Sequence, residues 1–434
     1  MAASRQVRAG IALTAALALT LSACAGGGGG GSSTPGVTDN SVTIGSTIPL
    51  TGPAAPGYSE QGPAAKAFFD YVNANGGVNG RQISLKYLDD GYNPAQTVTL
   101  TKQLVLQDNV FAVVGALGTP THTKVVDFLN SSRVPDLFVA SGCTCWDNPK
   151  EHPYTYGWQP DYTVEGKILG DYVKKNFAGK KVAYFYQDDD FGRDGMKGLD
   201  KYIDPSQVVQ RQPYQPGNTD VAAQVSAIAR SQADVVVLET IPAYTALFKL
   251  TSLKLGYNPK LLASSVGADP ITVSGLLENF AKQSGASVKG SDLIEGLVTS
   301  AYLPALNDMS NSWTALFKKI HDQYIPNVPF DGNVYYAMSY AYTFVQALQA
   351  AGKNLTRQGL IDALNKGGLR GPGLVPFRYG ADSHAGFTGG QIAIVQSGAQ
   401  AAQGTPVTTD DADGPVVPYT EKQPTAPPNG IPAA

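Results

Sequence analysis

The sequence predicts an α/β protein with two domains of similar size. Short apolar runs, typical of parallel strands buried on both faces, alternate with segments of helical spacing along most of the 434 residues. The alternation stops at Trp158-Gln159-Pro160 and then resumes. A chain of this length usually divides into two or more domains, and its content of 43% hydrophobic and 15% charged residues indicates a well-filled core.

Residues 110–146 show the pattern most clearly. Two apolar runs, 110–116 and 135–140, each end in a polar turn that contains glycine, at 117–121 and 141–144. Residues 121–130 between them have helical spacing. In a strand–helix–strand unit both turns lie at the carboxyl edge of the sheet, where small polar ligands bind. We therefore expect these two turns to form half of a binding cleft.

Further elements follow the same reasoning in both halves of the chain. The first strand and helix of the first half are expected at 41–50 and 61–75, and the second pair at 83–88 and 94–107. After the break, helices and strands alternate from 162 to 267. The last third is expected to hold a strand at 297–303, helices at 313–324, 334–350 and 356–364, and strands at 375–379 and 391–395.

The N-terminus carries an export pattern. Arg5 and Arg8 precede an apolar run at 11–21 that is too short to span a bilayer, and Leu21-Ser22-Ala23-Cys24 follows. These residues resemble the lipobox of bacterial lipoproteins. The resemblance implies a signal peptide at 1–23, a lipid on Cys24 and an extracytoplasmic protein anchored to the cell membrane, with a flexible Gly/Ser-rich tether at 24–39.

Other function classes find little support in the sequence. A formal net charge of −3 gives no indication of nucleic-acid binding. The four histidines are scattered without metal-ligand spacing, and no nucleophile elbow or zinc-protease motif is present. We expect no metal and no cofactor. Cys143 and Cys145 form either a tight disulfide or two reduced thiols packed behind their turn.

Five segments together carry a more specific resemblance. They read IPLTGPAA from Ile48, NANGGVNG from Asn73, DDGYNPAQ from Asp89, DDDFGRDG from Asp188 and AAGKNLTR from Ala350. In this order and spacing they resemble the type I solute-binding proteins of ATP-driven importers, in the branch that includes the branched-chain amino-acid binding proteins. The resemblance covers residues 40–400.

The resemblance implies two Rossmann-like lobes with parallel sheets, joined by three crossover strands near Trp158, Tyr302 and Gly371. Lobe one would comprise 40–157 and 303–371, and lobe two 158–302 and 372–402, with 403–434 as a loose tail. A small solute would be trapped between the lobes of a monomer that delivers it to an importer permease.

Position by position, the resemblance also implies ligand-binding residues. Those of lobe one hold a solute carboxylate through hydroxyl and backbone N–H groups, and those of lobe two cover the solute. The lobe-one residues are Tyr58, Gly118, Thr119, Ser141, Gly142 and Cys143, and the lobe-two residues are Phe191, Thr240, Ile241 and Ser265.

At one position the chain departs from the amino-acid binders. They present a glutamate to the ligand's ammonium where this chain has Ser265. Glu239 or Asp269 could replace that carboxylate; otherwise the site suits an aromatic or short aliphatic acid without an ammonium group, because a buried unpaired ammonium is costly. Two other functions stay open: a ligand-sensing protein for a signalling partner, and an extracytoplasmic enzyme.

Overall fold

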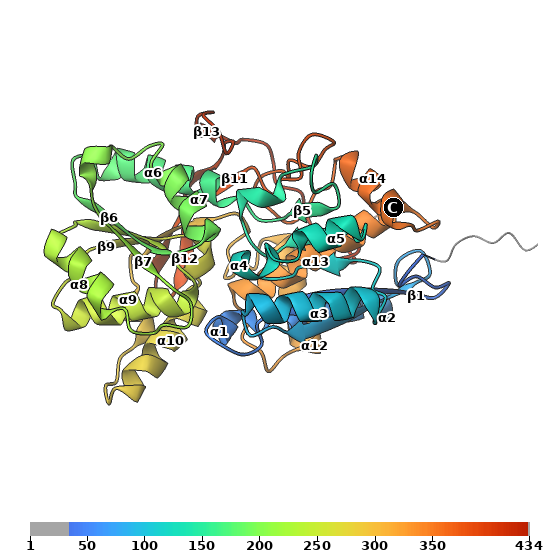
Figure 1. Cartoon of the computed structure of the whole chain (residues 1–434), viewed down its shortest axis with the longest axis horizontal. Helices are drawn as coiled ribbons and strands as arrows, with labels where there is room; N and C mark the ends of the chain where they lie inside the picture. Colours follow the sequence, from blue (N-terminus) through green and yellow to red (C-terminus); the bar gives the residue numbers. More distant parts are fainter. Residues whose placement is uncertain (1–33, 433–434) are drawn as a thin grey trace, which may run out of the picture. The chain divides into compact units, whose positions relative to one another are not determined.

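The computed structural model describes residues 34–432, which form part of one compact unit (Figure 1). The signal peptide, Cys24 and residues 24–33 of the tether lie outside the described residues. The expectation of a flexible tether is wrong for residues 34–39, which are bound to lobe one: Thr43 N–H donates to the Gly36 carbonyl (2.8 Å), and the Thr34 hydroxyl donates to the Leu355 carbonyl (3.3 Å). Within the described part of the chain, no helix combines the length and hydropathy needed to cross a membrane.

Lobe one is built on a five-stranded, all-parallel sheet. Its strand order is β2-β1-β3-β4-β5, as expected for successive β-α units. Helix α13 packs along α2 beside this sheet. The elements of this lobe are β1 (Ser41–Ile48), α1 (Ala55–Tyr58), α2 (Gln61–Ala74), β2 (Gln82–Asp89), α3 (Pro94–Leu106), β3 (Val113–Val114), α4 (Thr119–His122), α5 (Val126–Ser131), β4 (Asp136–Val139), the 3₁₀ helix Thr144–Trp146, β5 (Thr155–Gly157), α12 (Ser312–Tyr324), α13 (Gly332–Ala351) and α14 (Arg357–Asn365).

Lobe two is built on an eight-stranded mixed sheet. Its order is β13-β12-β11-β10-β9-β8-β6-β7, and the five strands from β10 to β7 are parallel. Strands β11, β12 and β13 extend it in antiparallel pairing. The elements are α6 (Tyr162–Asn176), β6 (Val182–Gln187), α7 (Asp190–Leu199), a 3₁₀ turn (Pro205–Gln207), β7 (Val208–Tyr214), α8 (Ala222–Ser231), β8 (Val235–Glu239), α9 (Pro242–Lys254), β9 (Lys260–Ala263), a 3₁₀ turn (Ser265–Gly267), α10 (Pro270–Gln283), α11 (Gly290–Leu293), β10 (Val298–Ala301), β11 (Gly389–Gln396), β12 (Ala399–Thr408) and β13 (Val417–Pro418).

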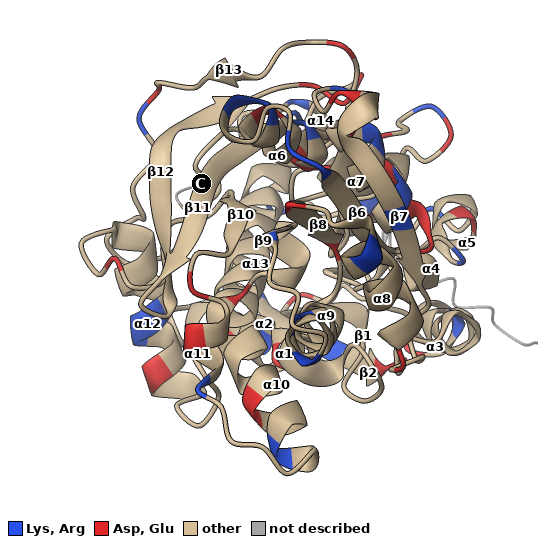
Figure 2. Cartoon of the chain, turned by 90° about the vertical axis from the view of Figure 1, so that its left-hand side faces the viewer, with Lys and Arg blue, Asp and Glu red and all other residues tan. Residues whose placement is uncertain are grey.

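Strand β8 shows why the apolar runs are nearly continuous. Val235 and Val237 belong to one hydrophobic cluster, while Val236 and Leu238 belong to another. Alternate side chains point to opposite faces of a strand, so both faces of this sheet are covered. Figure 2 shows most charged residues on the helices and loops around the strands of this lobe.

The chain passes between the lobes near Trp158, between β5 and α6, and near Tyr302, between β10 and α12. There Phe387 N–H donates to the Trp158 carbonyl (3.1 Å), and Leu374 N–H donates to the Tyr302 carbonyl (2.8 Å). The indole N–H of Trp158 donates to Thr343 Oγ1 (3.0 Å), which ties the first passage to α13.

The third passage lies near Phe387, whereas the sequence placed it near Gly371. Residues before it still bind strand β5 of lobe one. The Tyr379 hydroxyl donates to the Gly157 carbonyl (2.7 Å), and a ring nitrogen of His384 lies 2.8 Å from the Thr155 carbonyl. The strand expected at 375–379 is reduced to a single bridge between Phe377 and Phe387.

The helix expected at 121–130 is split into α4 and α5. Thr121 Oγ1 donates to the Leu117 carbonyl (2.8 Å), and Thr123 Oγ1 donates to the Thr119 carbonyl (2.9 Å). Hydroxyls that bond to nearby backbone carbonyls compete with regular helix geometry, which explains the interruption.

The expectation of a loose tail at 403–434 is wrong for its described residues. Strand β12 pairs with β11 up to Thr408, and residues 410–432 then contact both lobes. In lobe two they surround the ammonium of Lys167. In lobe one the Trp313 indole N–H donates to the Pro424 carbonyl and the Tyr71 hydroxyl to the Asn429 carbonyl, both at 2.6 Å. We call residues 410–432 the C-terminal strap. Side chains elsewhere in the chain bind its backbone, so its own composition did not reveal it.

Candidate functional site

A cavity of about 310 Å³ lies between the two lobes. This volume falls at the lower end of the range typical of small-molecule sites. Its walls come from both lobes and from the passages between them. Lobe one provides Tyr58, Gln61, Tyr92, Leu117, Gly118, Thr119, Ala140, Phe330, Gly332, Asn333, Tyr335 and Tyr336; the rest of the wall comprises Gln159, Tyr162, Phe191, Ile241, Ser265, Val266, Asp269, Pro270, Ile271, residues 300–307 and residues 398–400.

The turn after β3 brings a hydroxyl to the cavity wall. Gly118 has φ of 112°, and a Cβ at this residue would meet Thr121 and Tyr92, so the turn requires glycine. Thr119 opens α4 and shares a hydrogen bond of 2.7 Å with Ser141 from the neighbouring turn. The two turns predicted from the sequence therefore do lie together.

Six of the ten predicted ligand-binding residues line the cavity, and four do not. The six are Tyr58, Gly118, Thr119, Phe191, Ile241 and Ser265. Ser141, Gly142, Cys143 and Thr240 lie outside the cavity lining.

Each of these four residues is engaged elsewhere. Ser141 accepts the Cys143 N–H (3.3 Å) and bonds to Thr119, which stands between it and the cavity. Gly142 lies against Tyr162, whose N–H donates to the Gly142 carbonyl. Thr240 Oγ1 bonds to Thr245 Oγ1 at 2.6 Å within lobe two.

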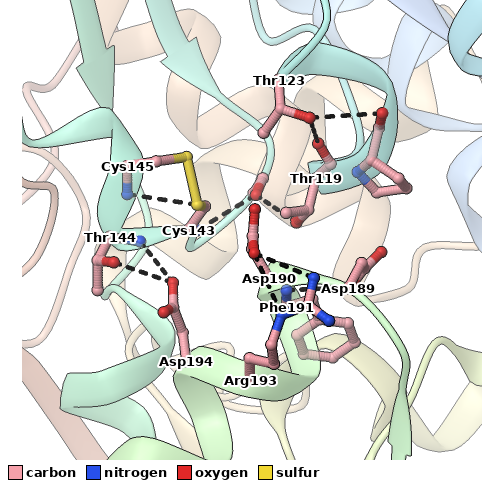
Figure 3. Close-up of a disulfide and its surroundings, with 12 residues drawn as sticks. Thr119, Thr123, Cys143, Thr144, Cys145, Asp189, Asp190, Phe191, Arg193 and Asp194 are labelled. Atoms are coloured by element: carbon pink, nitrogen blue, oxygen red, sulfur yellow. Dashed lines mark hydrogen bonds and ion pairs between the residues drawn. A yellow bond between two sulfur atoms is a disulfide. The ribbon is translucent and has the colours of Figure 1, made fainter. Parts of the chain in front are cut away.

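Cys143 and Cys145 form a disulfide in the turn after β4 (Figure 3). Between them, Thr144 donates its N–H (2.9 Å) and its hydroxyl (3.0 Å) to Asp194 on α7. The small disulfide loop of lobe one thus contacts lobe two directly.

Several aromatic residues in the wall were missed from the sequence. Tyr92, Tyr162, Tyr302 and Tyr336 all line the cavity, and the rings of Tyr162 and Phe191 lie 4.5 Å apart. Tyr162 and Tyr302 lie at the two predicted passages, which was the available signal. Tyr92 lies in DDGYNPAQ, a segment that carried the resemblance without a predicted ligand role, and Tyr336 lies in a predicted core helix.

Contacts across the cleft hold the lobes together around this wall. The Tyr58 hydroxyl donates to the Val266 carbonyl (3.1 Å), and the Gln187 amide donates to the Tyr92 hydroxyl (3.2 Å). Burial raises the pKa of Tyr162 to about 12, so this phenol is neutral and available as a hydrogen-bond donor.

The cavity wall contains no lysine, arginine or histidine among the described residues. Its one acidic side chain, Asp269, is already engaged, because Thr272 N–H and Gly332 N–H donate to its two oxygens at 2.7 and 2.8 Å. Glu239, the other candidate for an ammonium partner, is buried outside the lining. Its pKa is raised well above the usual range, first by burial and then by Glu165.

Glu165 is a buried carboxyl group directly behind the wall. Its Oε1 accepts Ser265 N–H and Ser300 Oγ–H, both at 2.5 Å. Burial raises the pKa of Glu165, while these two hydrogen bonds lower it. Ser265 and Ser300 therefore stand between this carboxyl group and the cavity.

The three consecutive aspartates after β6 serve local structure. Asp189 accepts the Phe191 N–H at the start of α7 (3.0 Å), which is an N-cap. Asp190 pairs with the exposed Arg193 at 3.2 Å (Figure 3), and Asp188 pairs with the same side chain at 3.3 Å. Among residues 34–432, no group of three or more potential ligand side chains could hold a metal ion.

Two α/β lobes joined by three passages, with a ligand-sized cavity between them, define a two-lobed binding protein. A family model described as periplasmic binding protein matches residues 41–404, and the chain belongs to this family. Both the predicted family and the predicted fold class are confirmed.

Relatives at the sequence level are distant and partial. The chain is 28% identical over 212 residues to Leu/Ile/Val-binding protein homolog 3 of Brucella melitensis, a match that covers 45% of this chain and 53% of the relative. It is 23% identical over 295 residues to Leu/Ile/Val-binding protein homolog 7 of Brucella abortus, covering 63% and 70%. The chain thus matches about half the length of the first of these relatives.

Solved structures agree on the fold. A branched-chain amino acid ABC transporter protein from Thermus thermophilus with bound valine has a TM-score of 0.75 at 19% identity, covering 86% of this chain and 98% of that one. A fatty acid ABC transporter substrate-binding protein from Thermomonospora curvata has a TM-score of 0.72 at 22% identity, covering 89% and 98%.

Proposed function

We propose that this protein is the extracytoplasmic substrate-binding component of an ABC importer and carries out no catalysis. The observation that supports it best is the cavity of about 310 Å³ whose wall combines residues of both lobes. A solute that contacts both walls stabilises the closed arrangement, because only differential contacts shift such an equilibrium. A permease would then recognise the closed form. Names of the related proteins point in the same direction.

The solute we propose is a small carboxylate, either an amino acid or an aromatic or short organic acid. The Thr119 hydroxyl on the cavity wall supports carboxylate binding at the lobe-one turns, and Ser141 behind it bonds to this hydroxyl. Ser265 replaces the glutamate of amino-acid binders, and both oxygens of Asp269 already accept N–H groups. This lack of a free acidic partner favours an acid without an ammonium group, held between aromatic walls.

Titration calorimetry with leucine, leucinamide and benzoate tests the proposed solute class. We expect benzoate-like acids to bind, leucine to bind more weakly, and leucinamide not to bind. The Thr119→Val variant should weaken carboxylate binding about 10-fold, as expected for the loss of one hydrogen bond to a charged group. Thr99→Val is the matched control, since Thr99 bonds only to the Ala95 carbonyl on exposed α3. Tight leucine binding would exclude the preference for acids without ammonium.

The membrane anchor is a separate part of the proposal. We propose that Cys24 carries the lipid and that residues 24–33 tether a monomeric binding unit near its permease. Expression of the full chain and of Cys24→Ser in a bacterial host, followed by membrane fractionation, tests this. We expect Cys24→Ser to move from the membrane to the soluble fraction; equal membrane retention would contradict the anchor.

A further inference from the structure

Two helices from different lobes meet at their N-termini on one side of the cavity. Helix α10 of lobe two begins after Asp269, and helix α13 of lobe one begins after Asp331; each aspartate is the N-cap of its own helix. Both aspartates are buried, at 8% and 2% exposure.

Each cap also bonds to the helix of the other lobe. Asp269 accepts Thr272 N–H of its own helix (2.7 Å) and Gly332 N–H of α13 (2.8 Å). Asp331 accepts the first N–H groups of its own helix through Oδ1, and its Oδ2 accepts the Thr272 hydroxyl of α10 (2.9 Å). A Cβ at Gly332 would lie 2.7 Å from Asp269 Oδ2, so the close approach depends on glycine. We call Asp269, Thr272, Asp331 and Gly332 the interlobe clasp.

The clasp brings acidic groups together without a basic partner. Burial raises the pKa of Asp269 to about 6, with a further contribution from Asp331. The pKa of Asp331 rises to about 7, through burial and then through Glu60 from the turn before α2. Burial raises the pKa of Glu60 as well, while Asp331 lowers it. The other polar side chains at this seam, Gln61 and Asn333, are neutral.

Taking closure of the lobes from the proposed function, we propose that the interlobe clasp holds the lobes together in the absence of solute and takes up a proton as it closes. Asp269 and Asp331 are thus positioning residues for closure. They contact each other's helices through groups that solvent would reach if the lobes separated.

The sign of the pH effect follows from linkage. In separated lobes the carboxyl groups return toward their ordinary values, near 4, while in the clasp they hold protons more tightly. Closure is therefore favoured as the pH falls, and it weakens as the pH rises through the range from about 4 to 7. For one proton, the closing equilibrium changes by up to about 10-fold per pH unit within this window.

Substitutions distinguish the two aspartates. In Asp269→Asn, an NH2 group replaces one carboxylate oxygen. The side chain then has one acceptor oxygen for the N–H groups of Thr272 and Gly332, so one of these two hydrogen bonds is lost. In Asp331→Asn the Thr272 hydroxyl can reverse its direction and accept from the amide, so its contact persists. Gly332→Ala leaves both caps in place and removes only the close approach.

Fluorescence energy transfer between dyes at Lys102→Cys on α3 and Lys254→Cys on α9 measures closure without any ligand. The full chain carries Cys24→Ser so that the dyes attach only at these two exposed positions. We expect transfer to fall from pH 5 to pH 8. At pH 5, Asp269→Asn and Gly332→Ala should each reduce the closing equilibrium about 10-fold, while Asp331→Asn should reduce it less than either.

Asp220→Asn is the matched control, because Asp220 accepts the N–H of Ala222 at the start of α8 (3.0 Å), a bond within lobe two. Circular dichroism melting verifies that every variant folds. Transfer that does not depend on pH, or that is equal in wild type and Gly332→Ala, would overturn the clasp. Failure of the clasp would leave the calorimetric test of solute binding unaffected, so the two proposals fail separately.

Discussion

Lys167 should anchor the C-terminal strap to lobe two. Its side chain is 1% exposed on α6. The ammonium donates to Asp410 Oδ1 at 2.9 Å and to the carbonyls of Asp410, Ala412 and Gly414 at 2.7, 3.0 and 2.7 Å. Asp410 also accepts the N–H groups of Ala412 and Gly414, so the loop is folded around the ammonium as it would be around a metal cation.

We expect Lys167→Met to lower the free energy of unfolding by about 3 kcal/mol. Removing one partner from a buried ion pair typically costs about 3–5 kcal/mol, and the lower value applies because Asp410 is 39% exposed and stays hydrated. With an unfolding entropy of about 2.1 cal/mol/K per residue, this corresponds to a fall in Tm of roughly 3–4 °C for about 400 residues.

Calorimetric unfolding of four proteins tests this reasoning. They are the full chain and a chain ending at Thr409, each with and without Lys167→Met. In the shortened chain the substitution should cost less than about 0.5 kcal/mol, because the acceptors are gone and the ammonium is hydrated. Lys175→Met is the matched control on the same helix, where an exposed pair with Asp171 predicts little change. An equal cost of Lys167→Met in both chain lengths would refute the anchor.

Two further predictions concern buried groups outside the strap. Glu239→Gln should stabilise the protein at pH 8 and have little effect near pH 5. The pKa of Glu239 is raised in the folded protein, so this carboxyl group destabilises the fold as the pH rises above the ordinary pKa of a glutamate. Denaturant unfolding at both pH values measures this, with exposed Glu151→Gln as the control. Trp158→Phe should lower the unfolding free energy by about 2–3 kcal/mol, since it leaves Thr343 without the indole donor and creates a void; an unchanged midpoint would show that this passage tolerates loss of the contact.

Local features of the sequence determined the architecture of each lobe. Apolar runs such as β8 are buried on both faces of the sheet, which is the physical reason that they could be identified as strands from the sequence. The turns that follow β3 and β4 lie together because neighbouring parallel strands end at the same edge of the sheet. This rule predicted from the sequence that Gly118 and Thr119 line the cavity.

Long-range contacts decided which side chains reach the cavity. Ser141 is in a predicted turn, yet its hydrogen bond to Thr119, 22 residues earlier in the chain, turns it away from the cavity. Tyr92 and Tyr336 line the cavity although the sequence gave neither residue a predicted ligand role. A turn's position follows from the strand before it, whereas the direction of one side chain depends on neighbours distant in sequence.

The interlobe clasp and the C-terminal strap depended on tertiary structure entirely. The sequence suggested Asp269 only as a possible ammonium partner and gave no prediction for Asp331, and only the meeting of two lobes makes each of these helix caps bond to the other helix. The sequence of the strap shows no hydrophobic periodicity. Its backbone carbonyls bind the side chains of Lys167 and Trp313, and such contacts leave no pattern in the strap's own residues. Sequence periodicity reports the burial of a segment's own side chains; it carries no information about backbone groups that distant side chains bind.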